Sequence, residues 1–184
     1  MKRDMSIRVF IADDHEVVRL GIKSLLAGSD IEVVGEAADG AQALVGVKQL
    51  QPDVVLLDIR MPEGDGLTTL SRLRNDWPEA RVMILSTYDN PTYVARAVAL
   101  GANGYLLKGT TRDDLIAALE KVARGEDAWT RDELRRVTGA LATPRMSGDV
   151  DVPLTHRESE VLKQLAYGLT NKEIGQALGI SYET

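Results

Sequence analysis

The sequence has no cysteine, no long apolar run and no excess of positive charge, and each absence excludes a class of protein. Without cysteine the chain can form neither a disulfide bond nor a thiolate metal site, which fits a reducing compartment. No stretch approaches the roughly 18 consecutive apolar residues of a membrane-spanning helix. Asp13 and Asp14 end the short apolar run near the N-terminus, unlike a signal peptide. We therefore expect a cytoplasmic protein that does not associate with a membrane.

The formal net charge of −6 argues against a protein held to nucleic acid by its overall charge. A local basic patch could still bind nucleic acid. The 184 residues fit one large domain or two small ones, and the apolar share of 44% is enough for a buried core.

Strand-like apolar segments alternate with segments of helical periodicity over the first two thirds of the chain. The expected strands cover 7–13, 31–37, 54–58, 81–87 and 104–108, and the expected helices 15–28, 40–51, 66–77, 91–101 and 111–125. The strand at 54–58 is continuously apolar up to its last residue, as in a strand buried on both faces. This alternation predicts an α/β fold, a five-stranded parallel sheet with helices on both faces.

The pattern fades after residue 126 and then changes. Residues 130–142 could form one short polar helix, and 143–153 read as loop. Helical spacing resumes at 154, with two capping boxes of the Thr-x-x-Glu type. We therefore predict a first domain over 5–126, a linker over 127–152 and a small all-helical segment over 153–184.

Polar residues end several of the predicted strands. In a parallel sheet the carboxyl ends of the strands meet at one edge, and ligands bind beyond it. This edge should bring together Asp13, Asp14, Asp58, Ser86 and Lys108. Taken alone, the two adjacent aspartates could equally form a turn and a helix cap.

The combination of these side chains indicates phosphoryl transfer. Three converging carboxylates resist ionisation unless a cation neutralises them, and hard oxygen ligands suit Mg²⁺. A carboxylate beside Mg²⁺ can attack a phosphoryl group. The ammonium of Lys108 and the hydroxyl of Ser86 could then stabilise the charge that develops.

The segments "ADDHEVVRLG", "VVLLDIRMPEGDGL", "MILST" and "GANGYLLKG" resemble the receiver domain of two-component response regulators of the NarL/LuxR type, over residues 7–125. The resemblance implies a flavodoxin-like fold and makes Asp58 the phosphoacceptor. It also implies that Asp14 and Asp58 bind Mg²⁺ together with the main-chain carbonyl of Arg60, and that Asp13 acts mainly through water.

The same resemblance assigns a switch. Ser86 matches the hydroxyl that binds the phosphoryl group, with Thr87 as its neighbour. We prefer Ser86 because of its strand position and its spacing from Lys108. Tyr105 matches the aromatic residue that reorients on activation, although it could simply pack as a strand aromatic.

The chain departs from the usual receiver pattern at two places. Gly109 stands where many receivers have proline, and Glu63 and Asp65 replace small residues in the loop after the predicted phosphoacceptor.

The segment "LTHRESEVLKQLAYGLTNKEIGQALGIS" resembles a LuxR-type helix-turn-helix, whose recognition helix would open near "SYET". By this resemblance the sequence stops within that helix, so we expect this length of chain not to bind DNA specifically. The resemblance assigns partial DNA contacts to six residues: Thr170, Asn171, Lys172, Ser181, Tyr182 and Thr184.

The leading hypothesis is a response regulator that receives phosphate from a sensor histidine kinase, forms a homodimer on activation and controls transcription through DNA. A second is a receiver that acts by protein–protein contact, with a non-functional C-terminal segment. A third is an aspartyl-phosphate hydrolase, but Arg60 stands where such enzymes place a second aspartate. We therefore expect no classical enzyme, only a protein that catalyses its own phosphorylation and dephosphorylation.

Overall fold

The computed structural model describes residues 6–62, 65–131 and 133–135. These residues form a five-stranded parallel sheet in the order β2-β1-β3-β4-β5. The strands are β1 (Ile7–Ala12), β2 (Ile31–Ala37), β3 (Val54–Asp58), β4 (Val82–Ser86) and β5 (Gly104–Leu107). The helices are α1 (Glu16–Leu26), α2 (Gly40–Leu50), α3 (Gly66–Asp76), α4 (Pro91–Ala99) and α5 (Arg112–Ala123).

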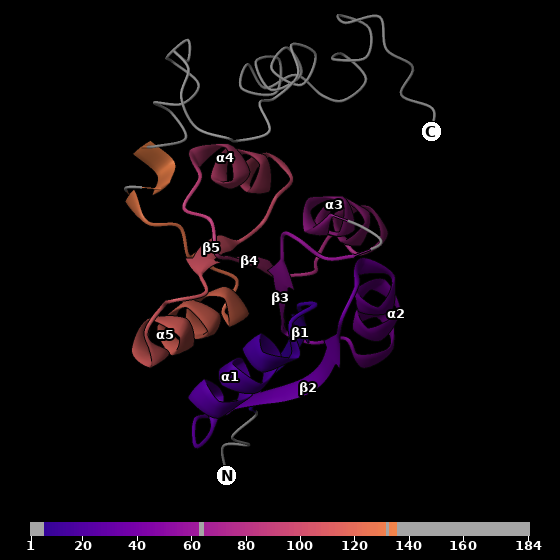
Figure 1. The fold of residues 1–184 in the computed structure, drawn as a ribbon, viewed down its shortest axis with the longest axis vertical. Coiled ribbons are helices and arrows are strands. Elements are labelled where there is room, and N and C mark those ends of the chain that lie inside the picture. The colour runs from indigo at the N-terminus through magenta and orange to yellow at the C-terminus, as the bar shows by residue number, and fades with distance from the viewer. Residues whose placement is uncertain (1–5, 63–64, 132, 136–184) are drawn as a thin grey trace, which may run out of the picture. The chain divides into compact units, whose positions relative to one another are not determined.

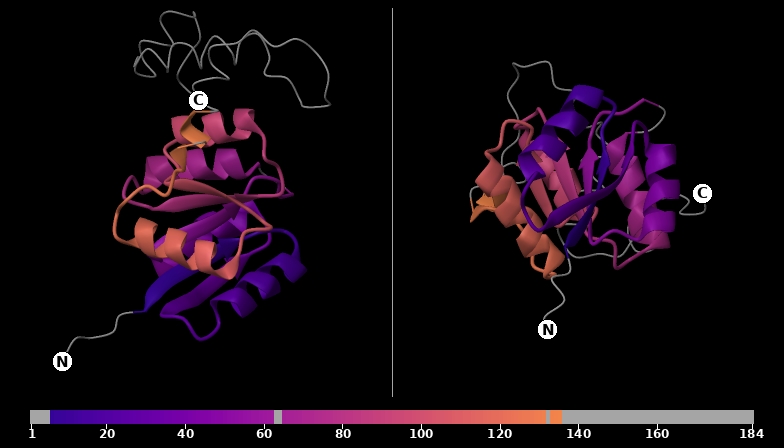
Figure 2. Two further views of the ribbon diagram at one scale, coloured as in Figure 1. Left: turned by 90° about the vertical axis from the view of Figure 1, so that its left-hand side faces the viewer. Right: turned by 90° about the horizontal axis from the view of Figure 1, so that it is seen from below.

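Helices cover both faces of the sheet. Figure 1 and Figure 2 show α1 and α5 on one face and α2, α3 and α4 on the other. Every residue of β3 and β4 is buried, because each face of these central strands packs into its own apolar cluster. The predicted fold class is confirmed, and the continuous apolar runs have the cause expected of parallel strands.

Side-chain caps set where several helices begin. Asp39, Asp65, Asn90 and Thr111 each accept a hydrogen bond from a backbone N–H in the first turn of the helix that follows. At the other end of α1, Gly28 has a φ of +75°, a conformation that favours glycine. Predicted and observed ends of the ten elements differ by two residues at most, as is usual for the ends of helices.

Part of the predicted organisation lies outside the described residues. Of the helix expected over 130–142, residues 131 and 133–135 are helical, residue 130 precedes the helix, and residues 132 and 136–142 are not described. The helical segment expected over 153–184 and the acidic residue Glu63 also lie outside the described part. Among the residues described, no helix is long and apolar enough to cross a membrane.

The single phenylalanine of the chain, Phe10, fixes how α2 approaches the sheet. Phe10 is 1% exposed. A Cβ atom on Gly46 of α2 would lie 2.6 Å from the Phe10 ring, and one on Gly35 of β2 would lie 2.8 Å from it. These glycines therefore provide the space that the ring occupies.

We predict that Gly46→Ala lowers the free energy of unfolding by about 1 kcal/mol. Alanine improves helix propensity by ~1 kcal/mol, but overpacking a fixed ring costs ~1–3 kcal/mol. The matched control is Gly21→Ala in α1, where an added Cβ has nothing within 4 Å. This control should raise the free energy of unfolding by ~0.5–1 kcal/mol. Urea denaturation of both variants measures the difference, and equal stabilisation by both would contradict the steric argument.

Candidate cation and phosphoryl-acceptor site

The polar residues predicted to meet do lie at one edge of the sheet. Asp58 is the last residue of β3 and Ser86 the last of β4. Asp13 and Lys108 directly follow β1 and β5. Because all strands are parallel, the sheet carries these side chains on adjacent carboxyl ends.

Lys108 joins two buried carboxylates. Its Nζ lies 2.7 Å from Asp13 Oδ2 and 3.1 Å from Asp58 Oδ2. Asp13 is fully buried and Asp58 is 4% exposed. A buried carboxylate is costly unless it is paired, so this ammonium is what allows both acids to remain at the end of an apolar strand.

The pKa values of Asp58 and Lys108 reflect the sharing of one ammonium between two carboxylates. Burial raises the pKa of Asp58, the charge of Asp13 raises it further, and contact with Lys108 opposes both. Burial disfavours the Lys108 ammonium, but its contacts with Asp13 and Asp58 outweigh this and raise the pKa of Lys108. The lysine is therefore charged, and the site retains an excess of negative charge.

The residues after β1 add a third carboxylate and a turn. The backbone N–H of His15 donates to Asp13 Oδ1 at 2.9 Å. Asp13 therefore also stabilises the turn before α1. The His15 side chain is 66% exposed, and its Nδ1 lies 2.7 Å from Asp14 Oδ1. Sequence reasoning did not foresee this contact.

The carboxylates fit a divalent cation. Asp13, Asp14, His15 and Asp58 each offer one ligand atom, and these atoms lie within 4.8 Å of one another. Two of the carboxylates share one ammonium, and oxygen ligands with excess negative charge suit Mg²⁺.

A tight loop follows Asp58. The Gly66 N–H donates to the carbonyl of Ile59 at 2.7 Å. A Cβ atom on Gly66 would overlap the main-chain oxygen of Asp58, so only glycine fits here. Asp65, unexplained by the sequence, is the cap of α3 and accepts from the Leu67 N–H at 3.2 Å.

The predicted switch residues converge on the backbone of Tyr88, which sequence reasoning missed. Ser86 Oγ accepts a hydrogen bond from the Tyr88 N–H at 3.0 Å. The Tyr105 hydroxyl donates to the Tyr88 carbonyl at 2.6 Å. Ser86 and Tyr105 are buried, whereas Thr87 is exposed. The loop after β4 therefore connects the hydroxyl at the end of β4 with the aromatic on β5.

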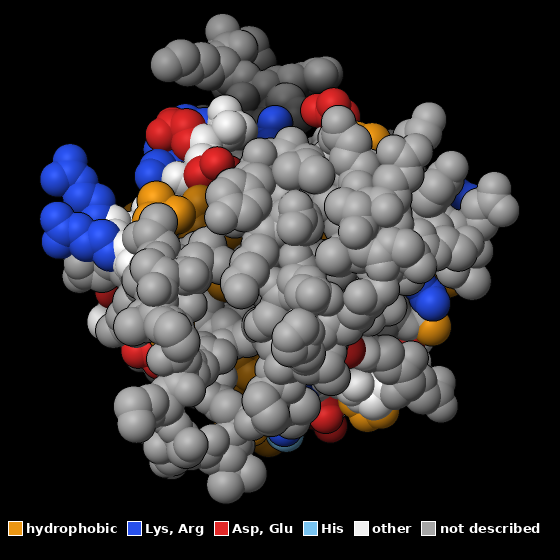
Figure 3. All heavy atoms as spheres, turned by 90° about the horizontal axis from the view of Figure 1, so that it is seen from above, with side chains coloured by type: hydrophobic (Ala, Val, Ile, Leu, Met, Phe, Trp, Pro, Cys, Tyr) orange, Lys and Arg blue, Asp and Glu red, His pale blue; other side chains and the backbone are white. Residues whose placement is uncertain are grey.

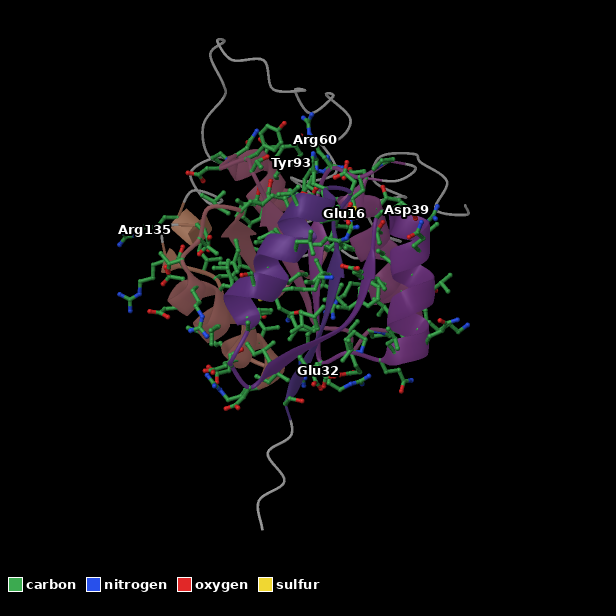
Figure 4. All side chains as sticks on the ribbon, turned by 60° about the horizontal axis from the view of Figure 1, so that its bottom comes forward. Glu16, Glu32, Asp39, Arg60, Tyr93 and Arg135 are labelled. Atoms are coloured by element: carbon green, nitrogen blue, oxygen red, sulfur yellow. The ribbon has the colours of Figure 1, made fainter. Side chains whose placement is uncertain are left out.

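The side chain of Arg60 bridges two further segments at this end of the molecule. Its guanidinium lies 4.7 Å from the centre of the Tyr88 ring and donates to the Tyr93 hydroxyl at 3.2 Å. Figure 4 shows Arg60 and Tyr93 side by side. Arg60 follows β3, whereas the two tyrosines lie five residues apart in "STYDNPTY". Only that tyrosine pair could have suggested the contact from the sequence.

The predicted DNA contacts cannot be placed on this surface, because Thr170, Asn171, Lys172, Ser181, Tyr182 and Thr184 lie outside the described residues. On the described part of the face in Figure 3, acidic, basic and apolar side chains lie beside one another.

Two family models match the chain. Residues 9–120 match the response regulator receiver domain, and residues 152–184 match the bacterial regulatory proteins of the luxR family. The response regulator protein VraR of Staphylococcus aureus is 36% identical over 181 residues, which are 98% of this chain and 85% of VraR.

Solved structures show the same likeness. The signal receiver domain of NarL from Mycobacterium tuberculosis is 40% identical with a TM-score of 0.63, covering 66% of this chain and 98% of that one. A structure of two RcsB dimers bound to two parallel DNAs is 28% identical with a TM-score of 0.66, covering 96% and 84%.

The environment of Tyr105 gives a prediction at high pH. Burial raises the pKa of Tyr105 to about 12, from an ordinary value near 10. The folded state favours the neutral phenol, so this contribution to stability is complete below about pH 10 and is lost as the pH rises toward 12. In an absorbance titration of tyrosinate, Tyr105→Phe should remove the transition at highest pH and Tyr88→Phe should retain it. If that transition survives in Tyr105→Phe, the assignment fails.

Proposed function

Because this chain belongs to the response regulators that join a receiver domain to a LuxR-type DNA-binding domain, we propose that Asp58 is its phosphoacceptor. The observation that carries the proposal is the sharing of Lys108 between Asp13 and Asp58 at the carboxyl edge of the sheet. The phosphoryl donor is a sensor histidine kinase, and both this exchange and transcription control point to a cytoplasmic location.

In the proposed transfer, a carboxylate oxygen of Asp58 attacks the phosphorus of a phosphohistidine. The P–N bond breaks as the P–O bond forms, and the imidazole leaves with the bonding electron pair. Lys108 moves its ammonium onto the developing phosphoryl charge, and the Ser86 hydroxyl donates to a phosphoryl oxygen. The protein thus promotes its own phosphorylation, without being an enzyme in the classical sense.

The residues that would hold Mg²⁺ are Asp13, Asp14 and Asp58 with the main-chain carbonyl of Arg60. When bound, the ion supplies positive charge to the phosphoryl oxygens and so reduces their repulsion from the acids. The contact between Asp14 and His15 orients that carboxylate.

The switch follows from the contacts of Tyr88. When Ser86 rotates its hydroxyl toward the phosphoryl group, it loses the hydrogen bond that its Oγ accepts from the Tyr88 N–H at 3.0 Å. The Tyr88 carbonyl is held by Tyr105, so a shift of the loop is passed to β5 and α4. A change at the face formed by β5 and α4 can bias dimerisation and DNA binding by the luxR-family segment. The similar protein RcsB has been solved as dimers bound to DNA.

We predict that acetyl phosphate and Mg²⁺ add the mass of one phosphoryl group to the intact chain. Asp58→Asn should abolish the gain, because the amide cannot act as the nucleophile. Asp76→Asn, at an exposed position on α3, is the matched control and should gain the group like the wild type. Intact-mass spectrometry decides the matter, and an Asp58→Asn variant that still gains the group would defeat the proposal.

We also predict that Lys108→Met binds Mg²⁺ about tenfold more tightly than the wild type. The ammonium that repels the ion and pairs with both acids is lost, and tenfold corresponds to only ~1.4 kcal/mol. A full charge pair at 4 Å near a protein surface contributes ~4 kcal/mol, so a tenfold change is a conservative expectation.

Titration calorimetry measures this affinity. Lys23→Met is the control, because Lys23 pairs with Glu36 at 2.9 Å and contacts none of the four candidate ligand residues. An affinity that is unchanged or weaker in Lys108→Met would show that the lysine does not oppose the cation.

A further inference from the structure

Asn103 lies at the amino ends of the strands, opposite the carboxyl ends that carry Asp58. It connects the chain after α5 with the start of β4 and β5. The backbone N–H of Asn103 donates to the Val82 carbonyl at 2.7 Å, and its side-chain Oδ1 accepts from the Val82 N–H at 3.0 Å. Its Nδ2 donates to Asp127 Oδ1 at 3.0 Å, and its carbonyl accepts from the Ala128 N–H at 2.7 Å. One half-buried residue thus joins three segments.

The packing around Asn103 is adapted to this segment. The next residue, Gly104, is buried, and a Cβ atom there would lie 3.2 Å from Ala128 Cβ and 3.3 Å from Met83 Cε. The absence of a side chain on Gly104 lets Ala128 lie against the strand. The stretch Asp127–Trp129 therefore behaves as part of the receiver fold, although the receiver family match ends at residue 120.

Trp129 links this stretch to the switch. It is half-buried and packs against the apolar cluster that contains Tyr105 and Val94 of α4. Trp129 and Leu134 also help to line a hollow of about 610 Å³ beside Val98. Trp129 therefore contacts the apolar cluster that contains Tyr105 and also borders the hollow beside α4.

We propose that Asn103 is a positioning residue that fastens the chain after α5 to β5, so that a shift of Tyr105 is passed to Trp129 and to the segment leading out of the receiver. The inference rests on the proposed function for its trigger, the phosphorylation of Asp58. The fastening itself is a property of the unphosphorylated chain and is tested separately.

An asparagine is required here because its amide both accepts and donates. Its oxygen accepts a hydrogen bond from the Val82 N–H, and its nitrogen donates one to the Asp127 carboxylate. In Asn103→Asp the new carboxylate can still accept from Val82, but it repels Asp127. In Asn103→Asp/Asp127→Asn the hydrogen bond can reform with donor and acceptor exchanged. Asp127→Asn alone retains an acceptor for the Asn103 amide.

The first experiment measures hydrogen exchange of the Ala128 amide by NMR in the wild type and these three variants. We expect exchange to be up to about tenfold faster in Asn103→Asp, the equivalent of one lost hydrogen bond. Asp127→Asn and the double variant should stay close to the wild type. Unchanged protection in Asn103→Asp, or a double variant that exchanges as fast as Asn103→Asp, would overturn the fastening.

The second experiment follows Trp129 emission in a Trp77→Phe background, before and after acetyl phosphate and Mg²⁺, with the intact mass measured on the same sample. We expect phosphorylation to shift the emission when Asn103 is present and the shift to be lost in Asn103→Asp. A phosphorylated sample whose Trp129 emission is unchanged would overturn the coupling. A sample that gains no mass would instead contradict the assignment of Asp58 as phosphoacceptor. Hydrogen exchange of the Ala128 amide would still test the fastening by Asn103.

Discussion

Two carboxylates that repel each other share the ammonium of Lys108, and the remainder of the site depends on that arrangement. Asp13 and Asp58 lie within 3.1 Å of the same nitrogen, at the ends of two neighbouring buried strands. The lysine follows β5, which is separated from β3 by β4, so its side chain crosses the carboxyl edge to reach them. An incoming phosphoryl group or cation therefore meets acids that are already in place.

The apolar sheet makes this geometry rigid. The central strands are buried on both faces, so neither can slide without exposing its core residues, and their ends are fixed relative to each other. Burial also explains why the pKa of Asp58 is raised: the position that orients this carboxylate is one that disfavours its charge. The protein retains an acid there because Lys108, and a cation where one binds, restore the balance.

The sequence was informative where a property repeats along the chain. Alternating periodicity predicted all ten elements, and strand ends predicted which acids would meet Lys108. It was uninformative where distant side chains meet. The contacts of Arg60 with Tyr93 and of Asn103 with Asp127 join separate segments, and no periodicity describes them. Asp65 was unexplained because its role as a helix cap depends on where α3 begins.

The shortest strand, β5, connects the candidate site at the carboxyl edge of the sheet with the chain that follows α5. β5 has only four residues, with Asn103 before it and Lys108 after it. Lys108 faces the acids, Tyr105 lies in the core between the edges, and Asn103 holds the chain that leaves the receiver. Because β5 is paired with β4 along its whole length, the positions of these three residues relative to one another are fixed. This short strand therefore connects the acids at the carboxyl edge directly with the chain that follows α5 at the opposite edge.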